Sequence, residues 1–307
     1  MCCCSQTKRD IMQEPFEDLS IDSMKVAIRE VQRIISAREF STYTEIHQHI
    51  CDVLKKHEGL GGGVALLRLG LTKGWQNVQS MDDLTAELIN RCDSFLSECE
   101  TGPKQQINDL LPFIRSSSKI LVHGCGQLLA LAVACAVQQR PGVQFYIAEG
   151  LPASQTRPHG AGSLLLERAK QTPEGFNLKG LLPASCTIVP DSAVGALMSE
   201  VDFVLMGANS VTEHGGLVHL VGSLQISIVA HATHVPCYVL CETFKFSHNF
   251  PLSTKDLKQP NDSTVVPAVE FVPPSMVTLI FSEQGIMPPS AVADEMFRNQ
   301  IADRESQ

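Results

Sequence analysis

The sequence predicts an α/β protein in which an N-terminal helical domain is followed by a doubly wound, mainly parallel, Rossmann-like sheet domain. Residues 20–115 carry apolar residues at helical spacing, whereas from residue 119 short apolar runs alternate with helical stretches. Strands that are apolar on both faces and separated by helices are typical of a parallel sheet covered on both sides. We therefore expect a disordered tail at 1–19, a helical domain at 20–115 and a sheet domain at 116–307.

The helical domain is predicted from apolar stripes and helix starts. In the segment 21–37, apolar residues recur every three or four positions and share one face, at Met24, Ile28, Val31 and Ile35. A second helix is expected at about 42–57, and another at 59–71 after a glycine-rich break. The segment from Ser80 to Asp83 resembles a capping box with the shorter acid, so a further helix should begin there.

The sheet domain is predicted from alternating β-type and helical runs. The strands are expected at 119–124, 143–150, 186–191, 202–209, 236–243 and 276–283. The helices between and after them are expected at 127–139, 162–171, 192–200, 217–234 and 290–301. Ligands of such sheets bind beyond the carboxyl ends of the strands, so the loops that follow the strands are the places to search.

Composition excludes several classes of function. The formal net charge is -9 with no long basic block, which argues against direct binding of nucleic acid. The longest apolar segments, such as 128–137, are about half of the roughly 20 residues that a membrane span needs, and no secretion signal is expected. Eleven cysteines lie mostly inside apolar runs, which indicates reduced thiols in the cytosol rather than disulfides or a metal site.

The chain begins with three successive cysteines, Cys2, Cys3 and Cys4. Clustered cysteines can carry palmitate, but the glycine that myristoylation needs at position 2 is absent. The alternative is a frayed tail without a lipid. The sequence leaves both interpretations open.

The loop after the first strand reads HGCGQ and has three interpretations. Gly124 and Gly126 match the first two glycines of a dinucleotide-binding GxGxxG, with Glu149 near the offset of a ribose-binding acid, but Leu129 replaces the third glycine. Cys125 could instead be a nucleophile activated by His123 and a helix N-terminus. The third interpretation is that Cys125 is only a small residue at a tight turn.

The segment 207–246 suggests an anion pocket. A strand ends at Gly207, and a polar loop ends in Gly215 and Gly216 before the next helix. Small residues let the backbone approach a ligand, and free N–H groups suit a phosphate. A sugar phosphate or a nucleotide would fit such a pocket without any catalytic group. The alternative is that these glycines serve only turns.

Three longer stretches resemble a known family. The stretches GANSVTEHGGLVHLVGS, PCYVLCETFKFSHNFPL and FVPPSMVTLIFSEQGIMPPSAVADEMF are similar to the family of translation initiation factor 2B alpha, beta and delta subunits and of related ribose-phosphate isomerases, including methylthioribose-1-phosphate isomerase. The likeness runs from about residue 20 to about residue 300. Within the family, the ETFKF, NFPL and PSAVADEM stretches and the compact length are similar to the alpha type.

Three departures separate the sequence from the isomerases of that family. The isomerases place a cysteine directly after the histidine of the first loop, whereas here Gly124 follows His123 and Cys125 comes one residue later. They have an aspartate after Gly-Ala in the later loop, where this chain has Asn209. They carry ETRP where residues 149–152 read Glu-Gly-Leu-Pro. An amide cannot transfer the carboxylate's proton, so the resemblance implies a scaffold without isomerase chemistry and with no catalytic residue.

The resemblance also implies a pocket. It would hold a sugar phosphate or a nucleoside monophosphate, with no cofactor and no metal, and its residues would be His123, Cys125, Glu149, Asp191, Asn209, Gly215, Gly216 and Lys245.

Partners follow from the resemblance too. It implies a homodimer that bridges two beta-gamma-delta-epsilon assemblies into the decameric guanine nucleotide exchange factor for initiation factor 2, and that senses the phosphorylated alpha subunit of factor 2. Phe244, Phe246 and Phe250 could anchor an interface or pack over their own sheet. The alternatives are an active isomerase of ribose-1,5-bisphosphate or methylthioribose-1-phosphate, and a free-standing small-molecule sensor.

Overall fold

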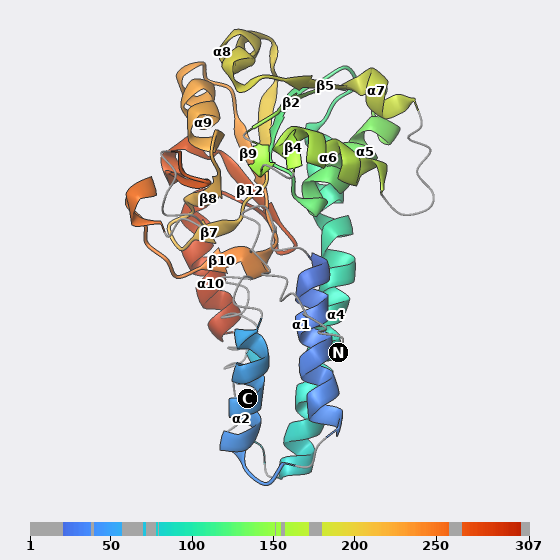
Figure 1. The fold of residues 1–307 in the computed structure, drawn as a ribbon, viewed down its shortest axis with the longest axis vertical. Coiled ribbons are helices and arrows are strands. Elements are labelled where there is room, and N and C mark those ends of the chain that lie inside the picture. The colour runs from blue at the N-terminus through green and yellow to red at the C-terminus, as the bar shows by residue number, and fades with distance from the viewer. Residues whose placement is uncertain are drawn as a thin grey trace, which may run out of the picture.

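The computed structural model confirms the predicted α/β class, with a helical part below a sheet domain (Figure 1). The structure describes residues 21–37, 40–56, 70–71, 78, 80–150, 152–154, 157–171, 180–257 and 266–301. The predicted tail and most of the helix expected at 59–71 lie outside these residues. Among the described helices, none combines the length and the apolar character that a membrane span needs.

Among its described residues, the helical part contains α1 (Ile21–Ala37), α2 (Tyr43–Lys55) and α4 (Met81–Leu110). The apolar face predicted for α1 is buried against α2 and α4. The Thr42 hydroxyl accepts the N–H of Glu45 at the start of α2, and the Ser80 hydroxyl accepts that of Asp83 at the start of α4. Each cap satisfies one N–H group that a helix start leaves without a partner.

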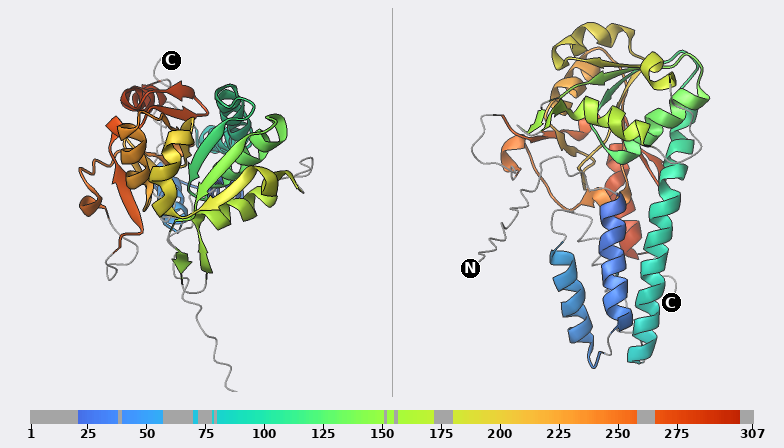
Figure 2. Two further views of the ribbon diagram at one scale, coloured as in Figure 1. Left: turned by 90° about the horizontal axis from the view of Figure 1, so that it is seen from above. Right: turned by 45° about the vertical axis from the view of Figure 1, so that its right-hand side comes forward.

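Helix α4 belongs to both parts of the molecule. Leu84 and Leu88, in its first half, lie in the core of the helical part, whereas Ile107 and Leu110, near its end, lie in the core of the sheet domain. Figure 2 shows this helix running without interruption from one part into the other. The 3-10 helix η3 (Leu111–Phe113) then leads to the first strand. Helix α4 therefore connects the two cores directly.

The central sheet has seven strands in the order β13-β12-β9-β6-β1-β2-β5. All neighbouring pairs are parallel except β12 and β13. The strands are β1 (Lys119–His123), β2 (Gln144–Ala148), β5 (Cys186–Val189), β6 (Phe203–Met206), β9 (Cys237–Leu240), β12 (Leu279–Ser282) and β13 (Gly285–Met287). This order confirms the six predicted strands, each somewhat shorter than expected.

Both faces of the sheet are buried. Ile120 and Val122 of β1 pack into a core with α5 (Gln127–Gln139) and α6 (Ala161–Lys170), whereas Leu121 packs into a second core with α9 (Ser223–Ala232). The remaining helices of this domain are α7 (Leu181–Ser185), α8 (Val194–Leu197) with the 3-10 turns η4 (Asp191–Ala193) and η5 (Met198–Glu200) on either side, and α10 (Val292–Ile301). The alternating burial of adjacent residues is what a doubly wound sheet requires.

A second, four-stranded sheet corrects one prediction. The helix expected at 217–234 begins only at Ser223, because residues 217–220 form β8 (Leu217–Leu220), which pairs antiparallel with β7 (Ser210–Thr212) and with β11 (Val269–Val272). The fourth strand is β10 (Phe246–Ser247), and a separate hairpin joins β3 (Pro152–Ser154) to β4 (Arg157–Gly160). Short 3-10 turns complete the fold: η6 (Thr243–Lys245), η7 (Thr254–Asp256), η8 (Pro274–Met276) and η9 (Pro289–Ala291).

Candidate functional site

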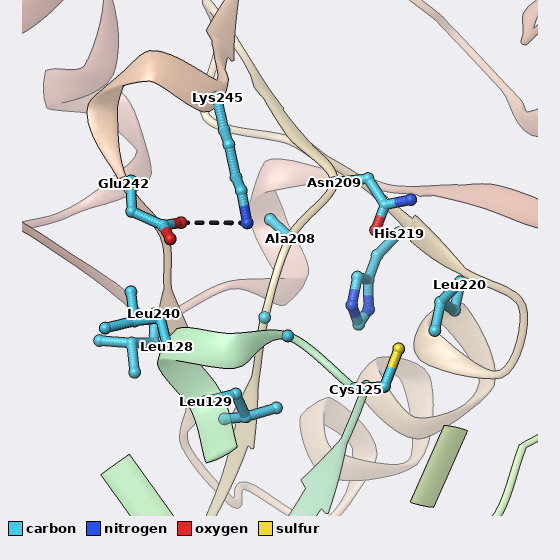
Figure 3. A pocket seen from close by; sticks show the side chains of 12 residues that line it. Cys125, Leu128, Leu129, Ala208, Asn209, His219, Leu220, Leu240, Glu242 and Lys245 are labelled. Carbon is cyan, nitrogen blue, oxygen red and sulfur yellow. Dashed lines mark ion pairs between the residues drawn. The ribbon is translucent and has the colours of Figure 1, made fainter. Parts of the chain in front are cut away.

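A pocket lies where the carboxyl ends of β1, β6 and β9 meet the first turn of α5. This is the edge of the sheet at which the sequence predicts a ligand-binding site. Figure 3 shows polar groups from three loops converging on it, with Cys125 from the first, Asn209 from the second, and Glu242 and Lys245 from the third. Among the residues that the structure describes, the lining is Cys125, Gly126, Leu128, Leu129, Gly207, Ala208, Asn209, His219, Leu220, Leu240, Glu242 and Lys245.

The geometry of the first loop explains why residue 124 of the HGCGQ motif is a glycine. Gly124 has a φ of +118°, and a side-chain carbon there would lie 2.8 Å from the ring of His219. Only glycine fits such a position without strain. Cys125 comes next and is buried, its sulfur pointing toward Leu220 and the His219 ring (Figure 3), while the guanidinium of Arg168 donates to its carbonyl oxygen. Gly124 is therefore required for local packing.

Glu242 and Lys245 form a buried ion pair inside the pocket. The distance between Lys245 Nζ and Glu242 Oε2 is 3.0 Å, and the two side chains are 5% and 6% exposed. The two residues are three positions apart in and next to η6, which brings their side chains to the same side. The Lys245 ammonium group inside the pocket is therefore balanced by the Glu242 carboxylate.

Two buried histidines meet behind the first loop. The rings of His123 and His219 pack edge to face with centroids 5.6 Å apart. His219 Nδ1 lies 2.7 Å from the Ser223 hydroxyl, and burial together with the nearby His123 and Lys245 places the pKa of His219 well below its ordinary value. Burial also lowers the pKa of His123. Both imidazoles are therefore neutral at physiological pH.

His123 stands beside the pocket rather than in its lining. Among the described residues, neither of its ring nitrogens has a hydrogen-bond partner. The backbone of Leu220 and Val221, close to the ring, opposes the lowering of its pKa, but neither group reaches a well-formed hydrogen bond.

The protein's own carboxylates occupy the N-termini of two helices, α6 and α9. Glu149 accepts hydrogen bonds from the Gly160 N–H at 2.8 Å and from the Ser163 hydroxyl, at the start of α6. Glu270 of β11 accepts the Leu224 N–H at 2.6 Å, at the start of α9. Helix α5 has no side-chain cap, and its N-cap residue Gly126 lines the pocket. An anionic ligand would therefore meet free helix N–H groups at α5.

Four predicted site residues lie outside the lining, in addition to His123. Glu149 is one of them, and so is Asp191, whose Oδ1 accepts the Gly150 N–H at 3.1 Å and joins the loop after β5 to the loop after β2. Gly215 and Gly216 serve packing, because side-chain carbons there would lie 2.3 Å from the Pro289 carbonyl oxygen and 2.6 Å from the Phe271 ring. The predicted residues that the structure brings together in the pocket are Cys125, Asn209 and Lys245.

The three phenylalanines predicted as interface anchors have different surroundings. Phe246 is buried in the chain's own core, so its side chain is not offered to a partner. Phe244 packs against the core of the helical part. Phe250 is 54% exposed, and its ring lies edge to face with His214 at a centroid distance of 4.9 Å.

Sequence reasoning missed two polar residues of the pocket, Glu242 and His219. Glu242 could have been found, since it lies three positions before Lys245 in the ETFKF stretch, directly after a strand. His219 could not, because the apolar run at 217–234 predicts a helix, whereas residues 217–220 form strand β8.

The pocket is tight. Its free volume is about 10 Å³, the space that about one water molecule occupies. A sugar phosphate can enter only if lining side chains move.

Among the described residues, no group of three or more His, Cys, Asp and Glu side chains is arranged to hold a metal ion. None of the eight cysteines that the structure describes is in a disulfide, and burial raises the pKa of Cys92, Cys186 and Cys237 to about 12.

A mainly parallel, doubly wound sheet with helices on both faces defines a protein of the Rossmann-like α/β class. Residues 20–289 match the model of the Initiation factor 2 subunit family, and the chain belongs to that family.

Relatives narrow the resemblance. A Dictyostelium discoideum translation initiation factor eIF2B subunit alpha is 30% identical over 243 residues, which cover 71% of this chain and 70% of the relative. The Caenorhabditis elegans eIF2B subunit alpha is 33% identical over 159 residues, covering 48% of this chain and 49% of the relative. These matches confirm the resemblance to the initiation factor 2B family. The ribose 1,5-bisphosphate isomerase of Archaeoglobus fulgidus is 24% identical over 69% of this chain and 67% of its own.

Solved structures support the fold. The translation initiation factor eIF-2B of Pyrococcus horikoshii OT3 superposes with a TM-score of 0.66 at 15% identity, covering 91% of this chain and 95% of that one. A chain of the tetrameric eIF2B-beta2-delta2 complex from C. thermophilum gives a TM-score of 0.68 at 14% identity, covering 90% and 88%. At these identities the likeness concerns the fold alone.

Proposed function

We propose that this chain is a non-catalytic, alpha-type regulatory subunit of the guanine nucleotide exchange factor for translation initiation factor 2. Its relatives named eIF2B subunit alpha support the choice of subunit. In this role the chain forms a homodimer that bridges two beta-gamma-delta-epsilon assemblies into a decamer. It works in the cytosol and contributes, chiefly through its helical part, to sensing of the phosphorylated alpha subunit of factor 2.

The observation that carries the non-catalytic assignment is Asn209 in the pocket. Proton transfer between the carbons of a sugar phosphate needs a group that can accept and release a proton. At Asn209 the chain offers an amide, and the carboxylate that does line the pocket, Glu242, is held by Lys245. The sulfur of Cys125 points toward Leu220 and His219. These groups can bind a ligand but are not arranged as an acid and base pair.

We further infer that the pocket binds a small phosphate-bearing molecule, either a sugar phosphate or a nucleoside monophosphate. The supporting groups are the uncapped start of α5 and the ammonium of Lys245, which lie in the same lining. A phosphate benefits from free helix N–H groups and from a cation together. This ligand would act as a regulator, since no chemistry is assigned to the pocket.

The subunit assignment is tested by purifying the tagged chain from its own cells and measuring the mass of the native complex. The expected result is a particle that contains this chain together with the beta, gamma, delta and epsilon subunits. Recovery of the chain without those four subunits would instead indicate a free-standing sensor. Sedimentation of the chain alone at micromolar concentration should give a dimer, and a monomer would remove the bridging role.

An active isomerase is the second candidate, because ribose 1,5-bisphosphate isomerases are among the relatives. It is tested by incubating the purified chain with ribose-1,5-bisphosphate and with methylthioribose-1-phosphate. The regulatory assignment predicts no turnover above the uncatalysed rate. Turnover that the substitution Cys125→Ser abolishes would establish the isomerase instead.

A further inference from the structure

The turn η6 connects the pocket to the helical part through three successive residues. Lys245 reaches into the pocket and pairs with Glu242. Phe244 packs against the core formed by α1, α2 and α4. The backbone N–H of Thr243 donates to the carboxylate of Glu283 at 2.9 Å, and its hydroxyl donates to the same group. A shift of this short turn would therefore change three contacts together: those with the pocket, with the core of the helical part and with Glu283.

Glu283 joins that turn to helix α4. The side-chain amide of Gln106, on α4, donates to Glu283 Oε2 at 2.9 Å and to the Cys241 carbonyl oxygen at 3.1 Å. Gly102, one turn earlier, lets the helix approach closely, because a side-chain carbon there would lie 3.2 Å from Glu283 Cβ. Gln106 is fully buried, so its contact with the turn between β12 and β13 is protected from water.

The charges around Glu283 make this junction sensitive to the state of Glu242. Burial raises the pKa of Glu283 to about 7, and the hydrogen bonds from Thr243 oppose the rise, while the nearby carboxylate of Glu242 adds to it. Another titratable group near Glu283 is the Cys99 thiol of α4, whose environment also includes Lys25, Glu98 and Glu242. Thr243, which donates to Glu283 from its N–H and its hydroxyl, is the residue next to Glu242, so the two carboxylates belong to one connected set of contacts. Within this set Lys245 pairs with Glu242.

We propose that a phosphate-bearing ligand replaces Glu242 as the partner of Lys245, and that the released Glu242 carboxylate changes the contact of Glu283 with Gln106 on helix α4. The pocket would then be coupled to the helical part through η6. The tightness of the pocket supports this route, because a phosphate ester cannot enter the space without displacing lining side chains. The coupling rests on the proposed ligand binding and not on the assignment as an exchange-factor subunit.

The first test measures amide hydrogen exchange of the full-length chain with and without ribose 5-phosphate, with uncharged ribose as the control ligand. The expected result is altered exchange in residues 99–110 of α4 with ribose 5-phosphate and no change with ribose. In the variant Glu283→Gln the sugar phosphate should still bind, but the response of α4 should fall to less than half. The variant Ser94→Ala, on the exposed side of α4, should keep the full response.

The second test uses the coupling in the reverse direction. If ligand binding changes the contacts of α4, a substitution that changes those contacts must change the ligand affinity. Calorimetric titration with ribose 5-phosphate should show an affinity change of about fivefold or more in Glu283→Gln. Thr243→Val removes the hydroxyl donor but leaves the Glu283 carboxylate, so it should show a smaller affinity change in the same assay. This second variant keeps the test valid if Glu283→Gln does not fold.

Binding with unchanged exchange in α4, or with equal affinity in wild type and Glu283→Gln, would overturn the coupling. Failure of ribose 5-phosphate and inorganic phosphate to bind at millimolar concentration would also overturn it. In that last case a native complex with the other four subunits would still support the assignment as a subunit.

Discussion

Lys245 and Glu242 lie 3.0 Å apart in a pocket where both side chains are almost fully buried. Removing one member of a buried ion pair leaves an uncompensated charge away from water, which costs about 3–5 kcal/mol. We therefore expect Lys245→Met to lower the free energy of unfolding by about this amount, measured by urea denaturation. The double variant Lys245→Met with Glu242→Gln should recover most of the loss.

The exposed pair Lys119–Glu200 provides the control for this prediction, since its members are 40% and 56% exposed. Glu200→Gln should leave the urea midpoint unchanged, because exposed pairs are screened by water. Equal losses at the buried and the exposed pair would show that Lys245 does not depend on its partner.

Glu283 should make stability fall as the pH rises from about 4.5 to about 7. Its pKa in the folded protein is raised to about 7 from the ordinary value of 4.5. The folded state then binds a proton that the unfolded state has lost, so this contribution to stability is fully present below about pH 4.5 and is lost as the pH rises through about 7. Glu283→Gln should be more stable than wild type at pH 8, by about 1–3 kcal/mol, and similar to it at pH 5. A constant difference between the two proteins across thermal melts from pH 5 to pH 8 would contradict the raised pKa.

His219 should act in the opposite direction on the acid side. Burial places its pKa well below the ordinary value of 6.5, so the unfolded state takes up a proton that the folded state does not. Its contribution to stability is present above about pH 6.5 and is lost as the pH falls. His219→Gln should reduce the loss of stability between pH 6.5 and pH 5, as measured by chemical denaturation at each pH. His231, an exposed histidine of α9, provides the control His231→Gln, which should keep the wild-type slope.

Glu149 is expected to stabilise α6 rather than to bind a ligand. Its carboxylate accepts from the Gly160 N–H and from the Ser163 hydroxyl. Glu149→Ala should lower the free energy of unfolding by about 1–2 kcal/mol, as the loss of a helix cap does. Glu149→Gln keeps an acceptor and should lose less. Calorimetry with ribose 5-phosphate should give the same affinity for both variants, and a lost affinity in Glu149→Ala would return this residue to the binding site.

Local sequence signals predicted the helices and strands well where one pattern acted alone. Helix α5 occupies the predicted residues, because its apolar run follows a glycine turn directly after a strand. Strand β8 was missed, since its four residues pair with β7 and with the distant β11, and this pairing decided their conformation.

The site was predicted only in part for a related reason. Cys125, Asn209 and Lys245 follow strands whose carboxyl ends meet, which the sheet topology allows one to foresee. The roles of Glu149 and Glu270 depend on which helix start each carboxylate reaches in the folded chain. For Glu270 that partner, Leu224, lies 46 positions away in the sequence. No pattern in the sequence reports such a distant contact.

If this chain bridges two exchange-factor assemblies, adding it to them must change the mass of the product. The purified chain is added to the beta-gamma-delta-epsilon assembly, and the mass of the product is measured by native mass spectrometry or light scattering. The expected product is a decamer in which a dimer of this chain joins two assemblies. An assembly whose mass is unchanged by a stoichiometric amount of the folded chain would contradict it.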